Sequence, residues 1–172
     1  MEMVKMASLD QQLRRIEKQL GKHMKIAMND VAKEVKKEQA KQVKSEVYDA
    51  YEPVSELKGG YKRRFDNGGL SDEDNMKHII KTDGNFTVLE IVNMTMSNPD
   101  FMPVSRSPFM ISGVIEFGHG WDGERYDYSK DGSEEFAQPR PFIQATRDEL
   151  VRSGKHIKAF RTSMQKQGFD IR

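Results

Sequence analysis

The sequence predicts an α+β fold with a long N-terminal helix, a small antiparallel sheet built on a β-hairpin, a short middle helix and a C-terminal amphipathic helix. Three observations lead to this prediction. Apolar residues recur every 3.67 positions over the first 35 residues, which is typical of one face of a helix. Asp83-Gly84 separates two β-rich runs, and this pattern favours a hairpin. A second apolar face recurs every seven residues after Pro141, and the length of the chain, residues 1–172, favours a single domain.

The first 51 residues are predicted to form the long helix. Ser8 and Gln11 form a capping-box pattern that predicts its start, and Pro53 predicts its end near Tyr51. A helix of this length is roughly 65 Å long, whereas a compact domain of this size is roughly 40 Å across. Either the helix extends beyond its domain and is covered by a second subunit, or it bends near 36–41. The apolar stripe before that point consists of Leu9, Leu13, Ile16, Leu20, Met24, Ala27, Val31 and Val35.

The middle of the chain is predicted to contain a loop over 52–76 and then a hairpin and a short helix over 77–117. The strand after the Asp83-Gly84 turn is apolar on both faces, so we expect both faces to be covered, by the chain's own helix and by a neighbour. Ser107-Pro108 is typical of a helix start, and Gly118 is typical of the residue that follows a helix end.

The last segment, 139–172, is predicted to form one helix followed by a strand. Pro141 marks the first turn of this helix, and Gly168 follows its last turn. Phe169-Asp170-Ile171 is the candidate for a terminal strand. The residues that define the apolar face are Ile143, Leu150, Ile157 and Met164, with Phe142 and Phe160 beside them.

Two short motifs bound a polar loop over 118–138. We expect Glu116-Phe117-Gly118 and Pro139-Arg140-Pro141-Phe142 to pack together, with Phe117 and Phe142 buried and Arg140 near Glu116. The alternative is that each motif only ends or starts a helix.

The polar loop and the segment 61–65 are the predicted sites of partner contact. Both are flanked by glycine and are too long for simple connections, and both contain aromatic residues of the kind that contribute strongly to interfaces. The residues that we single out are Trp121, Tyr126 and Tyr128 in the loop, and Tyr61, Arg63, Arg64 and Phe65 in the basic segment.

The composition argues against an enzyme, a disulfide scaffold and a membrane span. The chain has no Cys, 32% charged residues and a mean hydropathy of -0.77, and it lacks an apolar run of about 18 residues. We find no nucleophile, zinc-protease or phosphate-loop motif. His119 lies near Glu116 and Asp122, but without the fixed spacing of a metal site. We therefore expect no catalytic residue, no metal and no cofactor.

The net charge of +1 conceals a segregation of charge along the chain. Residues 83–138 contain 3 basic and 10 acidic residues, a net charge of -7, whereas 139–172 contain 8 and 3, a net charge of +5. Opposite patches on one chain favour head-to-tail attraction between copies; the alternative is that both are solvated faces. Cations interleaved with aromatics in 61–65 also suit nucleic-acid binding, so a nucleic-acid-binding or regulatory module of a mobile element is the alternative function.

The ordered set of motifs resembles the tail-completion, or head–tail joining (neck), proteins of long-tailed bacteriophages. The matching features are Pro53, Gly69-Leu70, the runs about Asp83-Gly84, and the two motifs at 116–118 and 139–142, over roughly residues 8–171. The chain departs from the family in a longer region before Gly68 and in the long 118–138 loop.

The resemblance implies a structural protein that multimerises into a ring at the head-proximal end of the tail, with no reaction and no cofactor. Its expected partners are other copies of itself, with six-fold symmetry to match a tail tube, and a tail terminator, a head connector or stopper, or the tail tube. Direct contact with DNA and a membrane location are not expected. The implied location is the tail or neck of the virion, and the host cytoplasm during assembly.

Overall fold

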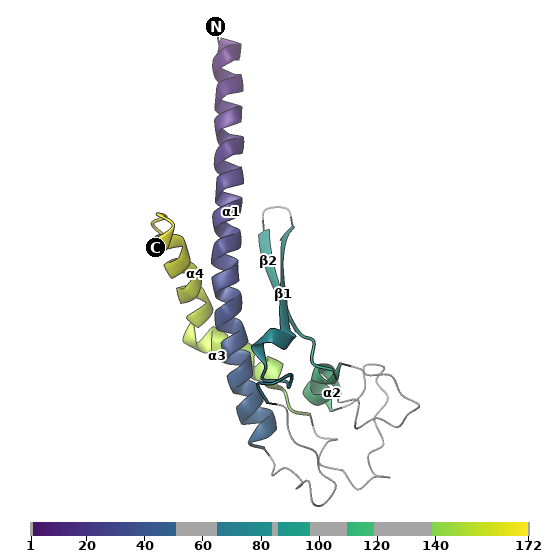
Figure 1. The fold of residues 1–172 in the computed structure, drawn as a ribbon. Helices are drawn as coiled ribbons and strands as arrows, with labels where there is room; N and C mark the ends of the chain where they lie inside the picture. Colours follow the sequence, from purple (N-terminus) through teal and green to yellow (C-terminus); the bar gives the residue numbers. More distant parts are fainter. Residues whose placement is uncertain (1, 51–64, 84–85, 97–109, 119–138, 172) are drawn as a thin grey trace, which may run out of the picture.

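The computed structural model describes residues 2–50, 65–83, 86–96, 110–118 and 139–171 and has the α+β fold that the sequence predicts. One long helix, α1 (Glu2–Gln42), extends out of a body that the other elements form around its C-terminal half (Figure 1). At about 1.5 Å per residue the 41 residues of α1 span roughly 60 Å. No helix in the described part is long and apolar enough to cross a membrane.

The start of α1 differs from the sequence-based expectation. The helix begins at Glu2, so Ser8 lies inside it and does not cap it. The capping-box prediction is therefore wrong. Met, Lys and Ala before Ser8 are good helix formers, and extending an existing helix fixes only one residue for each new hydrogen bond.

The helix is continuous through the stretch where a bend was the alternative. Glu38, Gln39 and Ala40 are all buried there, so this turn of α1 packs through polar and small side chains. The backbone instead changes to a π-helix, η1 (Val43–Tyr48), in which Val43 and Val47 are buried. The polar residues that weaken the apolar pattern thus belong to a packed turn of α1.

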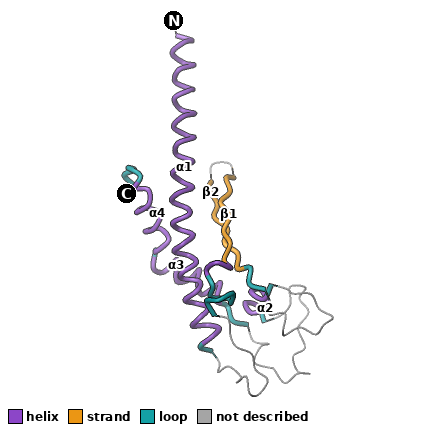
Figure 2. Tube along the Cα trace, viewed as in Figure 1, coloured by secondary structure: helices purple, strands orange, loops and turns teal. Residues whose placement is uncertain are grey.

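Two strands, β1 (Met76–Asp83) and β2 (Phe86–Asn93), form the predicted antiparallel hairpin. The register runs from Asp83 opposite Phe86 to Met76 opposite Asn93. The hairpin lies beside α1 (Figure 2). A hydrogen bond between His78 Nε2 and Asn29 Oδ1, 2.8 Å long, connects the hairpin to α1.

The two faces of the hairpin are buried to different degrees. In β2, exposed residues alternate with half-buried ones until the buried Asn93. In the single chain only the alternate set that includes Leu89 and Ile91 is partly buried, so cover for the other face by a neighbour stays a prediction.

The core lies where the C-terminal end of α1 and η1 meets the last third of the chain. Val43, Val47, Leu70 and Phe142 form one cluster, with Tyr48, Ile111 and Ile115 packed against it. Leu70 is held in place from η1, since its backbone amide donates to the Tyr48 hydroxyl at 3.0 Å. The core therefore joins segments that are distant in sequence.

A short turn before β1 approaches the rest of the backbone closely. A Cβ at Gly69 would lie 2.3 Å from the Phe65 carbonyl oxygen, so only glycine fits there. The 3₁₀ helix η3 (Glu73–Asn75) follows and leads into β1. Asn93 donates to the Leu70 carbonyl oxygen at 2.8 Å and so connects this turn to the end of β2.

The middle helix, α2 (Ile111–Phe117), begins later than expected. Its N-cap is Met110, which pairs with Met96 in an isolated β-bridge, so the predicted start at Ser107-Pro108 is wrong. The predicted end is confirmed, because Gly118 follows it with φ of 68°.

The C-terminal segment contains two helices, not the single helix that was predicted. α3 (Phe142–Ser153) ends at Gly154, whose φ of 63° is left-handed, and α4 (Lys155–Lys166) begins directly after it. The seven-residue repeat therefore does not form one face, and Ile143 and Ile157 are exposed. The predicted terminal strand is also wrong, because the described residues after α4 are irregular. Phe169 instead contacts the His23 ring edge-on, with centroids 4.9 Å apart.

Candidate interaction surfaces

The projecting half of α1 is an uncovered amphipathic helix. Its residues 9–22 are all exposed. One face of it, which we call the α1 stripe, consists of Leu9, Leu13, Ile16 and Leu20, and these side chains are 42 to 59% exposed. Ala27 and Val31 continue the same stripe and are buried in the body. The α1 stripe is thus the exposed part of the same helix face that packs against the body farther along α1.

Charges are distributed unevenly around this part of α1. At about 100° per residue, Asp10 and Glu17 fall on one edge of the α1 stripe, and Gln12 and Gln19 fall on the other. The opposite side of the helix contains a row of exposed cations with no ion pair in the described part of the chain. These cations are Arg14, Arg15, Lys18, Lys22 and Lys25.

The hairpin presents a second exposed apolar surface on the side away from α1. The register places Ile79, Phe86, Val88 and Val92 on one face, which we call the outer hairpin face. These side chains are 39 to 74% exposed. Single exposed apolar residues are common, but groups of them on one face are typical of interaction sites.

The outer hairpin face also contains charged residues. Lys77, Lys81 and Glu90 share it by register. Lys81 Nζ and Glu90 lie 2.6 Å apart. Lys77 Nζ donates to the Asp74 carbonyl oxygen at 2.8 Å and forms no ion pair with the described residues.

The two motifs that bound the polar loop meet at the base of the molecule. Glu116 is buried in α2, and its carboxylate accepts hydrogen bonds from the backbone amides of Ile143 at 2.7 Å and Gln144 at 3.1 Å. The Arg140 amide donates to the Ile115 carbonyl oxygen at 2.8 Å. Glu116 thereby caps the N-terminus of α3, where free amides and the helix dipole favour an anion.

The expected details of this contact are partly wrong. Phe142 is 0% exposed, as predicted, but Phe117 is 59% exposed because it is the last residue of α2 and lies beyond the buried face. The Arg140 guanidinium donates to the Val47 carbonyl oxygen at 3.3 Å. The Glu116 carboxylate accepts hydrogen bonds from backbone amides. Pro139 and Pro141 are exposed, and Gly118 is buried.

Most residues of the two predicted partner-contacting segments lie outside the described part of the chain. Phe65 is described: its φ is 45°, and its ring contacts the Tyr48 ring at a centroid distance of 4.7 Å. Phe65 therefore packs partly against η1. The residues that lie outside the described ranges are Tyr61, Arg63, Arg64, Trp121, Tyr126 and Tyr128.

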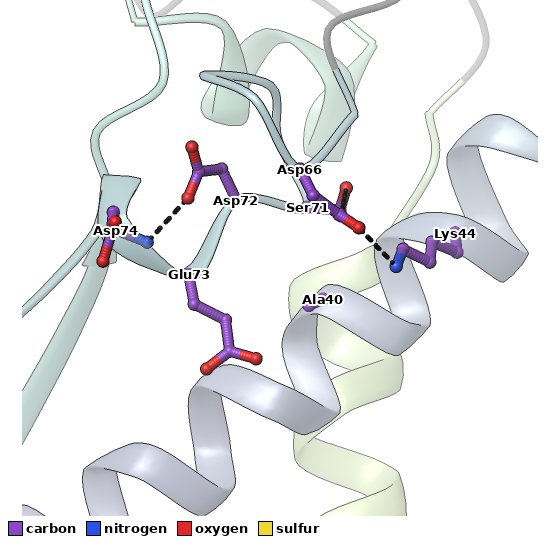
Figure 3. A pocket seen from close by; sticks show the side chains of 7 residues that line it. All are labelled: Ala40, Lys44, Asp66, Ser71, Asp72, Glu73 and Asp74. Atoms are coloured by element: carbon purple, nitrogen blue, oxygen red, sulfur yellow. Dashed lines mark hydrogen bonds and ion pairs between the residues drawn. The ribbon is translucent and has the colours of Figure 1, made fainter.

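An open hollow of about 300 Å³ beside η1 is lined by acidic residues (Figure 3). Asp66 accepts from the Ser71 hydroxyl at 2.6 Å and from Lys44 Nζ at 3.0 Å. These contacts lower the pKa of the Asp66 carboxyl, with the Ser71 hydrogen bond as the largest cause. Asp72 accepts from the amides of Gly68 and Asp74.

These two carboxylates therefore stabilise the turn before β1. In the described ranges, no group of three or more side chains is arranged to hold a metal ion. His119 and Asp122, which were considered as ligands, lie outside those ranges.

A polar clamp that the sequence analysis missed joins α1 to α4. Glu38 is 4% exposed and accepts from Lys155 Nζ at 2.6 Å and from Gln42 Nε2 at 2.9 Å. Burial raises the pKa of the Glu38 carboxyl and is the largest single effect, but the hydrogen bonds and the charges of Lys155 and Lys41 together lower it below its ordinary value. Only tertiary structure could reveal this pair, since 117 positions separate the two residues.

Comparison with protein families gives a match over most of the chain. The model of a family described as YomN matches residues 9–166. This range includes the α1 stripe, the hairpin and both motifs that bound the polar loop. No curated protein and no solved structure matches the chain.

Proposed function

The chain belongs to the YomN family, whose name is of the prophage type, and is a phage-related protein; we propose that it is a structural protein of the virion. In this proposal, copies of the chain multimerise into a ring at the head-proximal end of a phage tail. The ring completes the tail or joins it to the head connector. Its further partners are a tail terminator, a head connector or stopper, or the tail tube.

The observation that carries this proposal is the uncovered α1 stripe. Its exposed Leu and Ile side chains belong to a helix that extends beyond its own body. Burying such side chains contributes roughly 1.5–3 kcal/mol each. A protein that functions as a monomer gains no stability from an uncovered apolar stripe on a projecting helix. A subunit of an assembly gains stability when a partner buries that stripe. The prophage-type family favours an assembly in a phage particle.

Two measurements test the proposal. Light scattering of the purified chain should give a mass that is a multiple of the 19.8 kDa monomer. In a phage that encodes the chain, deletion of residues 122–136 should leave the fold intact and give tails that lack heads in electron micrographs. A monomer in solution together with absence of the chain from purified virions would refute the proposal.

The row of cations on α1 favours nucleic-acid binding as the second candidate function. Arg14, Arg15, Lys18, Lys22 and Lys25 lie within a sector of about 100° and face solvent. Such a row suits contact with a phosphate backbone. Fluorescence anisotropy with duplex DNA distinguishes the candidates, because a DNA-binding protein loses affinity steeply as salt rises. Absence of binding at low salt would eliminate this second function.

A further inference from the structure

The chain has two exposed apolar surfaces of similar length at different places. The α1 stripe covers twelve residues from Leu9 to Leu20, whose ends are about 16 Å apart at a rise of about 1.5 Å per residue. The outer hairpin face runs from Phe86 to Val92, which is about 20 Å at about 3.4 Å per residue. Figure 1 shows the stripe's helix segment above the body and the hairpin beside the middle of α1. A single chain leaves both surfaces open.

We propose that the α1 stripe of one copy packs on the outer hairpin face of a neighbouring copy. This inference rests on the self-association in the proposed function and names the surfaces that carry it. In the single chain, α1 already covers part of the inner face of the hairpin. A neighbour's helix on the outer face gives the hairpin a helix on each side, which accounts for apolar residues on both faces of β2.

The charges favour this pairing over contact between two α1 stripes. In an antiparallel pair of stripes, the edge with Asp10 and Glu17 would face the same edge of the other copy, and like charges would repel. In a parallel pair, that edge would face the uncharged Gln12 and Gln19.

The outer hairpin face instead offers a cation, Lys77, to the acidic edge of the stripe. Lys77 forms no ion pair with the described residues of its own chain, whereas Lys81 on the same face is already paired with Glu90. Asp10 and Glu17 likewise form no ion pair with described residues. The helix–hairpin contact can therefore match opposite charges at its edge while it buries apolar side chains.

The proposed contact is heterologous, which fits a ring. Each copy uses its stripe toward one neighbour and its hairpin toward the other, so every copy still has one open surface until the assembly closes. A contact between two stripes would be the same on both copies and would end at a dimer.

Disulfide capture tests which surfaces meet, and the chain suits it because it contains no Cys. A mixture of Leu13→Cys and Val88→Cys chains should form a heterodimeric disulfide on mild oxidation. A mixture of Leu13→Cys and Val151→Cys is the control, because Val151 is 71% exposed on α3 and belongs to neither surface. Disulfide formation between two Leu13→Cys chains, with none between Leu13→Cys and Val88→Cys, would overturn the inference.

Complementing variants give a second test that does not depend on disulfide geometry. Leu13→Glu blocks the stripe and Val88→Glu blocks the outer hairpin face, so each variant alone should be monomeric. Mixed together, they retain one intact stripe and one intact hairpin face, and light scattering should show a dimer. A mixture that remains monomeric under conditions in which the wild-type chain assembles would refute the contact but not the proposed function. A wild-type chain that is monomeric and absent from virions would refute both.

Discussion

Glu116 in α2 caps the N-terminus of α3 through Ile143, whose backbone amide lies 2.7 Å from the Glu116 carboxylate. The cap comes from 27 positions upstream in sequence, and it connects the two ends of the segment 118–138. The two elements are thereby fixed to each other independently of the residues between them.

Replacing Glu116 by alanine should destabilise the chain by about 1–2 kcal/mol, because it leaves the amides of Ile143 and Gln144 without their acceptor. Urea unfolding followed by circular dichroism measures this change. Glu116→Gln is the matched control, since it retains one acceptor oxygen and should lose less. Equal stability of the alanine variant and the wild type would show that the cap contributes nothing.

Phe142 and Phe117 should differ in their contribution to stability although both belong to the motifs that meet at the base. Phe142 is fully buried among Val43, Val47 and Leu70, so Phe142→Ala should cost about 3–5 kcal/mol. Phe117 is mostly exposed, so Phe117→Ala should cost less than about 1 kcal/mol. Melting temperatures of the two variants test this difference, and similar losses would contradict the assigned burial.

The clamp between Glu38 and Lys155 should contribute stability that depends on pH. The folded-state pKa of Glu38 lies below its ordinary value of 4.5. The carboxylate's contribution is therefore complete above about pH 4.5 and is lost as the pH falls through the folded-state pKa. Glu38→Gln should cost about 1–2 kcal/mol at neutral pH, a modest value because Lys155 is 38% exposed.

The difference between wild type and Glu38→Gln should then shrink as the pH falls below about 4.5 and through the folded-state pKa of Glu38. Urea midpoints of both chains across this range provide the measurement. The other acidic groups titrate in both chains, so the comparison isolates Glu38. A difference that stays constant with pH would mean that its charge does not stabilise α1 against α4.

The elements that local sequence determines were predicted, and those that depend on distant contacts were not. The hairpin register, with Asp83 opposite Phe86, agrees with the local Asp83-Gly84 signal in the sequence, and the end of α2 follows from the left-handed conformation of Gly118. That α1 continues past Glu38 was not apparent from the sequence. Glu38 is buried where it accepts a hydrogen bond from Lys155, which is distant in sequence. Glu116 was singled out, but the motif could not show that its partners are backbone amides of α3.

The break at Gly154 shows how a tertiary arrangement can override a periodic pattern. Ile143, Leu150, Ile157 and Met164 suggest one continuous face, yet Gly154 turns the chain so that only Leu150 and Met164 of this set are buried. Ser153-Gly154 was the available signal, since glycine is the usual residue after a helix end.

Gly154 and Gly21 should respond in opposite directions to alanine. Gly154 has φ of 63°, so Gly154→Ala should destabilise the chain by about 1 kcal/mol through backbone strain alone, because nothing lies within 4 Å of the added Cβ. Gly21 lies within α1 and has equally free space, so Gly21→Ala should stabilise it by about 0.4–1 kcal/mol. Thermal unfolding of both variants tests the conformations, and a stabilising Gly154→Ala would contradict the helix break.

Polar substitution in the α1 stripe should prevent assembly without unfolding the subunit. Leu13 and Ile16 are exposed on the projecting half of α1, so the double substitution Leu13→Gln and Ile16→Gln removes apolar surface that only a partner would bury. The loss of about 1.5–3 kcal/mol per side chain at each contact should shift the assembly toward monomers.

Light scattering measures the oligomer, and circular dichroism at the same concentration checks that the fold of the body persists. Val151→Gln is the control, because Val151 is exposed but lies on α3 away from the stripe, so this variant should assemble as the wild type does. If the double variant assembles normally, the α1 stripe is not the surface that joins the subunits. If it instead loses the fold of the body, the stripe contributes to the stability of the single chain, contrary to its exposure.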